Sequence, residues 1–268
     1  MHPTAEDRLA AECQTTVITC ARQAHAWAPS IGALIKKTGR DGRFDLLTAL
    51  DFPHLAGNKE VLTQAVEDAM LALSLHKGEQ ILVVGGANVE QIVAAVREQF
   101  HVSRKVFPNP ISEDVPINSI DMGPVPMPDA RCRTLAITCM DFRQHDNDLA
   151  TKLAMQLGLD EAPHILAMAG GAKDVEGTMR RSRLTLAQIN DYRERHDLRT
   201  IVITCHTDCG AFGGSQMFEN TAHEDAQFDY RLRVARGVLR RRFSGVAIIP
   251  AIVRLADGRI GTIERRDP

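Results

Sequence analysis

The chain has 268 residues, of which 44% are hydrophobic and 25% charged, a composition typical of a folded globular protein with one large domain or two of ordinary size. Its 32 Lys and Arg residues nearly balance 34 Asp and Glu residues, so the formal charge of −2 provides no field that would recruit nucleic acid or an anionic membrane. No window approaches the ~20 continuous apolar residues of a membrane span. The N-terminal sequence does not begin with basic residues followed by an apolar run, so we expect no secretory signal. Six cysteines are too few for a disulfide scaffold. We therefore expect a cytoplasmic protein with reduced thiols.

Short β-rich segments alternate with helical segments along the whole chain. In the first half the sequence predicts strands over Thr15–Cys20, Asp45–Leu50 and Gln80–Gly85, and helices over Lys59–His76 and Val89–Phe100. In the second half it predicts strands over Arg133–Cys139, His164–Met168 and Thr200–Cys205, and helices over Asn147–Leu157, Val175–His196 and Asp225–Phe243. Strands that are apolar throughout and separated by helices favour an α/β fold with a mostly parallel sheet flanked by helices on both faces. The last 25 or so residues read as strand, Asp257-Gly258 turn and strand, which predicts a terminal hairpin.

The two halves resemble each other. A Pro-rich stretch, Gly123–Pro128, is typical of an extended linker and divides the chain into residues 1–122 and 130–268. On either side of it, Ile18-Thr19-Cys20 recurs as Ile137-Thr138-Cys139, and Gly57–Val61 recurs in type as Gly171–Val175. Two parallel α/β halves look alike in any case because strand composition converges. The recurring segments nevertheless occur in the same order and are separated by similar numbers of residues, which favours a tandem duplication.

Chemically informative residues follow two predicted strands of the second half. The first strand ends in Cys139 and the third is followed by His206 and Cys209. Because the carboxyl ends of neighbouring parallel strands converge on one crevice, we expect these three side chains to lie close together. Thiolate and imidazole suit Zn²⁺, and three protein ligands leave a fourth position open. Asp141 is near enough to supply the fourth ligand or, alternatively, to pair with Arg143.

The sequence around these residues resembles a known family. The chain reads CMDFR, then AMAGGAKD, then HTDCG, in the order of the motifs of the β-class carbonic anhydrases, and the resemblance covers residues 131 to 264. It implies zinc on Cys139, His206 and Cys209, and an Asp141–Arg143 pair that keeps the fourth position for water. It also implies that Asp141 could move onto the metal in an inactive state. The implied activity is that of a lyase, the reversible hydration of CO2 to bicarbonate by hydroxide that zinc supplies at neutral pH.

A glycine pair, Gly170 and Gly171, follows the second predicted strand. It lets the backbone approach closely, and the start of the next helix could stabilise an anion such as bicarbonate, so we assign the pair to substrate binding. The alternative is a simple tight turn.

The chain also departs from the family. Met168 stands where the family usually has an Asn ahead of Ala-Gly. A compact subset of the family, which the second half resembles equally well, hydrolyses carbonyl sulfide or carbon disulfide. The alternatives to CO2 hydration are therefore hydrolysis of these sulfur analogues, or a non-catalytic zinc protein whose fourth ligand is permanently Asp141.

The first half lacks most of the site. Cys20 matches Cys139, but Gly86 and Val89 stand where the second half has His206 and Cys209. We therefore expect no metal in the first half. Because the family is built as dimers, the resemblance implies that the duplicated chain folds as an internal pseudo-dimer, with homo-oligomers of such chains left open.

Overall fold

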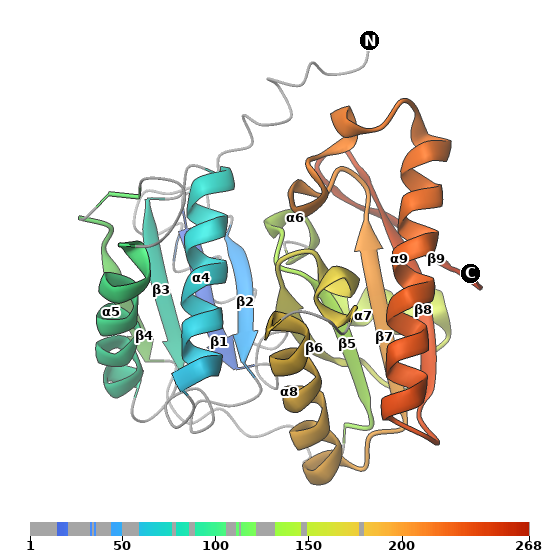
Figure 1. Ribbon diagram of the computed structural model, residues 1–268, viewed down its shortest axis with the longest axis horizontal. Helices are drawn as coiled ribbons and strands as arrows, with labels where there is room; N and C mark the ends of the chain where they lie inside the picture. Colours follow the sequence, from blue (N-terminus) through green and yellow to red (C-terminus); the bar gives the residue numbers. More distant parts are fainter. Residues whose placement is uncertain are drawn as a thin grey trace.

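The computed structural model describes residues 15–20, 33, 35, 44–49, 59–76, 79–85, 89–105, 111–112, 114–121, 132–145, 149–176 and 180–267. These residues form an α/β structure of two mostly parallel sheets flanked by helices, one in each half of the chain (Figure 1). In this part of the chain, no helix is both long enough and apolar enough to cross a bilayer.

The first sheet has four parallel strands in the order β2-β1-β3-β4. Its elements are β1 (Thr15–Cys20), β2 (Asp45–Ala49), α4 (Lys59–His76), β3 (Gln80–Gly85), α5 (Val89–Arg104) and β4 (Ile117–Asp121). Successive side chains of a strand point to opposite faces. Ile18 and Leu47 therefore pack with α4 and α5, whereas their neighbours Val17 and Leu46 belong to a second apolar cluster.

The second sheet has five strands in the order β6-β5-β7-β8-β9, with β9 antiparallel to β8. Its strands are β5 (Thr134–Cys139), β6 (His164–Met168), β7 (Thr200–His206), β8 (Ala247–Ala256) and β9 (Arg259–Arg265), and its α-helices are α6 (Phe142–His145), α7 (Leu149–Leu157), α8 (Arg180–His196) and α9 (Thr221–Arg242). Short 3-10 helices are η1 (Gly171–Val175), η2 (Gly210–Phe212) and η3 (Ser215–Met217). Ile137 and Ile203 pack with α8 and α9, and Ala136 and Val202 pack with α7.

The two sheets share their strand order and much of their register. Strands β2-β1-β3-β4 follow one another as β6-β5-β7-β8 do. In the first sheet Thr16 lies beside Asp45, and in the second Leu135 lies beside His164, which is the same pairing displaced by 119 residues. The two halves are thus built alike at the level of the backbone.

The halves meet along the edge strands β2 and β6, which lie next to each other (Figure 1). The Leu46 amide donates to the Met140 carbonyl at 2.9 Å, and the Phe142 amide donates to Asp45 Oδ1 at 3.0 Å. The apolar cluster under α4 and α5 extends across this boundary and includes residues from the carboxyl ends of the second sheet: Cys139, Met140, Ala169 and Cys209. Residues at the carboxyl edge of the second sheet therefore pack against the first half.

Several element boundaries differ from those predicted. Strand β4 was not predicted, and a single helix over Val175–His196 is wrong, because Gly171–Val175 form η1 and α8 begins at Arg180. Helix α9 begins four residues earlier than predicted, since the Asn220 side chain accepts a hydrogen bond from the His223 amide at 2.9 Å and caps the helix there. The Pro-rich linker and Leu50 lie outside the described residues.

Candidate metal centre

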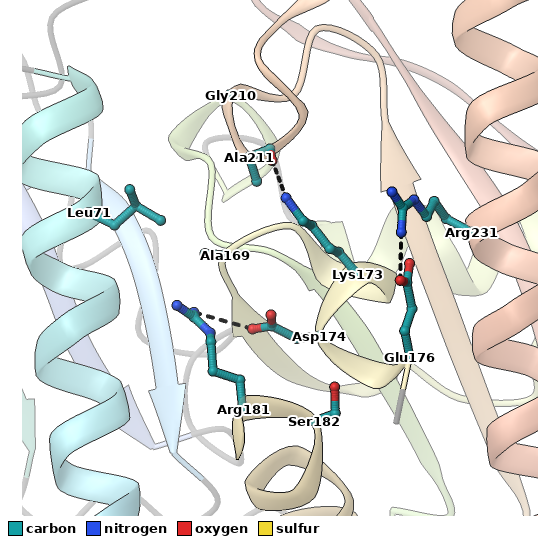
Figure 2. A pocket seen from close by; sticks show the side chains of 10 residues that line it. All are labelled: Leu71, Ala169, Lys173, Asp174, Glu176, Arg181, Ser182, Gly210, Ala211 and Arg231. Carbon is teal, nitrogen blue, oxygen red and sulfur yellow. Dashed lines mark hydrogen bonds and ion pairs between the residues drawn. The ribbon is translucent and has the colours of Figure 1, made fainter. Parts of the chain in front are cut away.

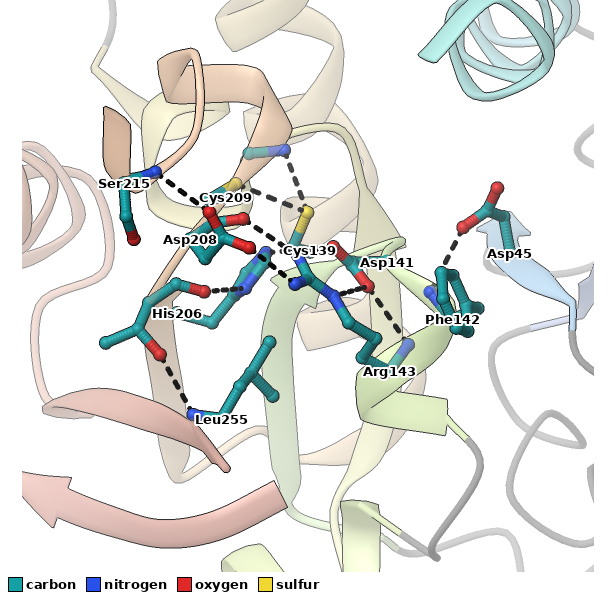
Figure 3. A network of polar contacts seen from close by, with 12 residues as sticks. Asp45, Cys139, Asp141, Phe142, Arg143, His206, Asp208, Cys209, Ser215 and Leu255 are labelled. Carbon is teal, nitrogen blue, oxygen red and sulfur yellow. Dashed lines mark hydrogen bonds and ion pairs between the residues drawn. The ribbon is translucent and has the colours of Figure 1, made fainter. Parts of the chain in front are cut away.

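The structure brings Cys139, His206 and Cys209 together at the carboxyl ends of β5 and β7 (Figure 3). Their ligand atoms all lie within 4.8 Å of one another, and the two sulfurs are 3.8 Å apart. All three side chains are buried, with exposed fractions of 5%, 0% and 1%. The group could hold a metal ion in a site closed to bulk solvent.

The chemistry of these donors fits a cation. His206 Nδ1 lies 2.9 Å from the Thr207 carbonyl, and the buried Nε2 has no hydrogen-bond partner within the part of the chain that the structure describes. With the proton on Nδ1, Nε2 carries the lone pair that a metal needs. The hydrogen bond with Cys209, burial and charge repulsion between the sulfurs raise the pKa of Cys139 well above its usual value. Two thiolates at this separation therefore require a positive partner.

Asp141 and Arg143 form a closely bonded pair beside this group (Figure 3). Arg143 Nε donates to Asp141 Oδ1 at 2.9 Å, and an Nη donates to Oδ2 at 2.7 Å. Asp141 Oδ2 is 3.8 Å from His206 Nε2, yet the carboxylate is not one of the mutually close ligand atoms. Arg143 thus holds both carboxylate oxygens next to the centre.

Asp208 is a second carboxylate on Arg143, and sequence reasoning missed it. Arg143 donates to Asp208 Oδ2 and to the Asp208 carbonyl, each at 2.8 Å. Burial alone would lower the pKa of the guanidinium, but Asp141 and Asp208 outweigh it and raise that pKa. Arg143 is therefore fixed between two acids and stays charged.

Glu224 completes this network from the first turn of α9. Its Oε1 accepts from the Asp208 amide at 2.8 Å and from Ser215 Oγ at 3.0 Å, and the Ser215 amide donates to Asp208 Oδ1 at 2.9 Å. Asp208 adopts a positive φ of 58°, a backbone conformation that Asp tolerates better than most residues. In the sequence Asp208 stands between the candidate ligands His206 and Cys209, and this position could have marked it as part of the site. No motif in the sequence marks Glu224.

His145 lies next to the end of β5 and contacts the backbone there. Its Nε2 is 2.9 Å from the Cys139 carbonyl. Burial lowers the pKa of His145 to about 4, so the imidazole is neutral at pH 7 and acts as a hydrogen-bond donor to that carbonyl.

Gly170 and Gly171 both have positive φ angles and lie close to other residues around the centre. Gly170 has φ +81°, and its amide lies 3.4 Å from Cys139 Sγ, a contact that favours the thiolate. Gly171 has φ +53°, and a Cβ there would lie 2.5 Å from the Thr204 carbonyl oxygen. The pair leads into the five-residue η1, whose first residue is Gly171, and not into the long helix predicted. The structure thus places Gly170 at a candidate ligand and Gly171 against the backbone of β7.

We expect Gly171→Ala to cost at least about 3 kcal/mol of unfolding free energy, because strain at positive φ and a clash with immobile backbone add together. Gly158 is the matched control, since it has φ +65° and nothing within 4 Å of a built Cβ. Gly158→Ala should cost only about 1 kcal/mol, the strain alone. Urea unfolding of both variants measures the difference. Equal losses would show that Gly171 is not held by close packing.

Among the residues that the structure describes, the only set of three ligating side chains is Cys139, His206 and Cys209 of the second half, and the first half shows no comparable group. Val89, at the position matching Cys209, begins α5 and is buried in the apolar cluster. The side chain of Cys20 and all of Gly86 lie outside the described residues.

No family model, no curated protein and no solved structure matches the chain.

Proposed function

We propose that the chain is a zinc enzyme that hydrates CO2 reversibly to bicarbonate. The observation that carries the proposal is the buried Cys139–His206–Cys209 group beside a carboxylate held by an arginine. Two sulfurs about 2.3 Å from a tetrahedral zinc ion lie about 3.8 Å apart, and the sulfurs here are 3.8 Å apart. Zinc in this group would lower the pKa of a water molecule from ~15.7 toward ~7 and so supply a nucleophile at neutral pH.

The protein's own groups orient the reaction. The Asp141 carboxylate, whose Oδ2 lies 3.8 Å from His206 Nε2, would accept a hydrogen bond from a water molecule activated in this group and so orient it toward CO2. Arg143 donates to both oxygens of this carboxylate and would keep it bonded to the guanidinium and not to the metal, and Asp208 fixes Arg143 in turn. The apolar residues Met140 and Ala169, packed with the ligands, suit an uncharged linear substrate.

The same apolar surroundings make hydrolysis of carbonyl sulfide or carbon disulfide the second candidate. Met168, the departure from the family pattern, is buried with α8, and its sulfur accepts a hydrogen bond from Thr185 Oγ1 at 3.5 Å. No polar side chain at position 168 is therefore offered to a substrate. CO2, COS and CS2 are linear electrophiles with the same valence electron count, so the metal group alone does not select among them.

Stopped-flow measurement of CO2 hydration by the zinc-loaded chain, alongside hydrolysis of COS and CS2, tests the proposal. We expect CO2 turnover that follows bound zinc and disappears on chelation. Turnover of a sulfur substrate alone would move the assignment to the second candidate, and no turnover of any of the three would contradict an enzymatic role.

We also propose that the chain is a tandem duplication folded as an internal pseudo-dimer. The shared strand order and the pairing displaced by 119 residues support this origin. On this account the first half lost its ligands and was retained because residues of its β2 and α4 pack in the same apolar cluster as Cys139 and Cys209.

Metal analysis of the purified chain should find about one zinc per chain, because among the described residues only the second half offers a group of three ligands. Total metal by mass spectrometry, divided by protein concentration, gives the ratio. A ratio of two would contradict the metal-free first half, and a ratio of zero after preparation without chelators would contradict the zinc assignment.

A further inference from the structure

Strand β2 of the first half is hydrogen-bonded to the segment that carries Asp141 (Figure 3). The Met140 carbonyl accepts from the Leu46 amide at 2.9 Å, and the Phe142 amide donates to Asp45 Oδ1 at 3.0 Å. The carbonyl belongs to the peptide bond that precedes Asp141, and the amide belongs to the peptide bond that follows it. Because peptide bonds are planar, β2 holds the backbone of Asp141 from both sides.

Asp45 is a buried acid at the start of β2, with an exposed fraction of 0%. Burying a carboxylate is costly unless donors satisfy it. Phe142 is the first residue of α6, and an amide in the first turn of a helix has no partner within that helix. The contact thus satisfies both groups. The matching position of the second sheet holds His164, so the shared strand pairing does not itself require an acid there.

The Asp141 carboxylate is bonded within its own segment of the chain. Its Oδ1 accepts from the Arg143 amide at 3.0 Å and from Arg143 Nε at 2.9 Å, and its Oδ2 accepts from an Arg143 Nη at 2.7 Å. These bonds join residues two positions apart, so the carboxylate moves with the backbone at the start of α6. Asp208 holds the guanidinium of this pair, whereas Asp45 and Leu46 hold its backbone.

A second contact between the halves does not involve the segment of Asp141. A pocket of about 510 Å³ opens between Leu71 of α4 and the η1, α8 and η2 segments (Figure 2). At this pocket Arg181 of α8 forms ion pairs with Asp68 of α4 and with Asp174 of η1. Arg181 therefore joins the halves away from the polar network of Figure 3 and offers a comparison for Asp45.

We propose that Asp45 is a positioning residue for Asp141, so that the first half sets the geometry of the centre in the second half. By holding the Phe142 amide, Asp45 fixes the start of α6 and keeps the Asp141 carboxylate bonded to Arg143 and not to a metal ion. The inference rests on the proposed function, because it concerns the carboxylate that would orient the activated water molecule.

Amide hydrogen exchange of the wild-type, zinc-loaded chain, followed residue by residue by NMR, tests this contact without a substitution. The Thr221 amide is the reference, because Thr221 is the exposed first residue of α9 and its amide bonds no group of the described chain. We expect the Phe142 amide to exchange at least about a hundredfold more slowly than the Thr221 amide, since Asp45 protects it.

The visible spectrum of a cobalt-substituted chain reports the ligands around the metal. Asp45→Ala removes the acceptor, so Asp141 should reach the metal in part of the molecules and the spectrum should shift toward that of Arg143→Ala. Asp45→Asn keeps an oxygen for the Phe142 amide and should restore the wild-type spectrum. Arg181→Met, the matched control, breaks the other contact between the halves and should leave the spectrum unchanged.

A double variant separates positioning of the carboxylate from general loosening of the fold. In a chain that already carries Asp141→Ala, Asp45→Ala should no longer shift the cobalt spectrum, because the shift depends on the Asp141 carboxylate. With Asp141 present, Asp45→Ala should keep its zinc and lose CO2 turnover about tenfold, as expected from loss of one hydrogen bond to a charged group.

A wild-type cobalt spectrum in folded Asp45→Ala, an equal shift in the absence of the Asp141 carboxylate, or exchange of the Phe142 amide as fast as that of Thr221 would overturn the proposal. If Asp45→Ala does not fold, Asp45→Leu fills the same space without an acceptor and gives the same comparison. The spectra and the exchange rates do not depend on turnover. Failure of the proposed function is a separate outcome, the absence of CO2 turnover in the wild type.

Discussion

Replacing Arg143 by alanine should reduce CO2 turnover by about 10²–10³-fold while the zinc content stays near one ion per chain. Arg143 donates to both oxygens of Asp141, and the Asp141 carboxylate already lies 3.8 Å from His206 Nε2. Without the guanidinium the carboxylate is free to move onto the metal and occupy the fourth ligand position. Stopped-flow hydration and metal analysis on the same preparation measure the two quantities.

The control for this variant is another Asp-x-Arg pair of the same chain. Arg199 donates to Asp197 at 3.0 Å across the same spacing, but both side chains are more than half exposed. Arg199→Ala should change neither turnover nor zinc content, since exposed ion pairs contribute ~0–1 kcal/mol. Asp141→Ala should keep zinc but lose turnover, because the position stays open while the orienting carboxylate is gone. Full activity in Arg143→Ala would contradict the role of the pair.

Alanine at any one of Cys139, His206 or Cys209 should remove both zinc and turnover. Each variant leaves two protein ligands, too few to hold a tetrahedral ion tightly. Zinc affinity, measured by competition with a chromophoric chelator, should fall together with CO2 hydration. The loss follows from the ligand set itself, so it should be the largest effect of any single substitution in the chain.

Cys205 provides a matched control for the ligand variants. It immediately precedes His206 on β7 but packs in the apolar cluster with α8 and α9, on the opposite face of the strand. Burial raises the pKa of this thiol, which keeps it protonated. Cys205→Ala and Cys20→Ala should both retain zinc and turnover. Retention of zinc by Cys209→Ala, or its loss from Cys20→Ala, would contradict the assignment.

The ligand group could be predicted from the sequence because it depends on a local rule. Cys139 ends one apolar strand, and His206 ends another that is its neighbour in a parallel sheet. Parallel strands place their carboxyl ends at one edge, so residues 67 positions apart come together once the strand order is right. The Cys209 sulfur follows within one turn.

Other parts of the site depend on tertiary packing that no local pattern shows. Glu224 reaches Asp208 because α9 begins at the Asn220 cap, four residues before the predicted start. Strand β4 escaped prediction because Asn118, Ser119 and Asp121 interrupt the apolar pattern expected of a central strand, and the strand lies at the edge of its sheet. The ion pair of Arg181 with Asp68 joins segments 113 residues apart and belongs to the contact between the halves.

A crystal structure of the zinc-loaded chain, determined at neutral and at raised pH, tests the central claim most directly. The account predicts zinc on Cys139, His206 and Cys209, with a non-protein fourth ligand and with Asp141 still bonded to Arg143 at raised pH. Asp141 bound to zinc at every pH, with Arg143 turned to solvent, would make the centre a structural zinc site and contradict the enzymatic function.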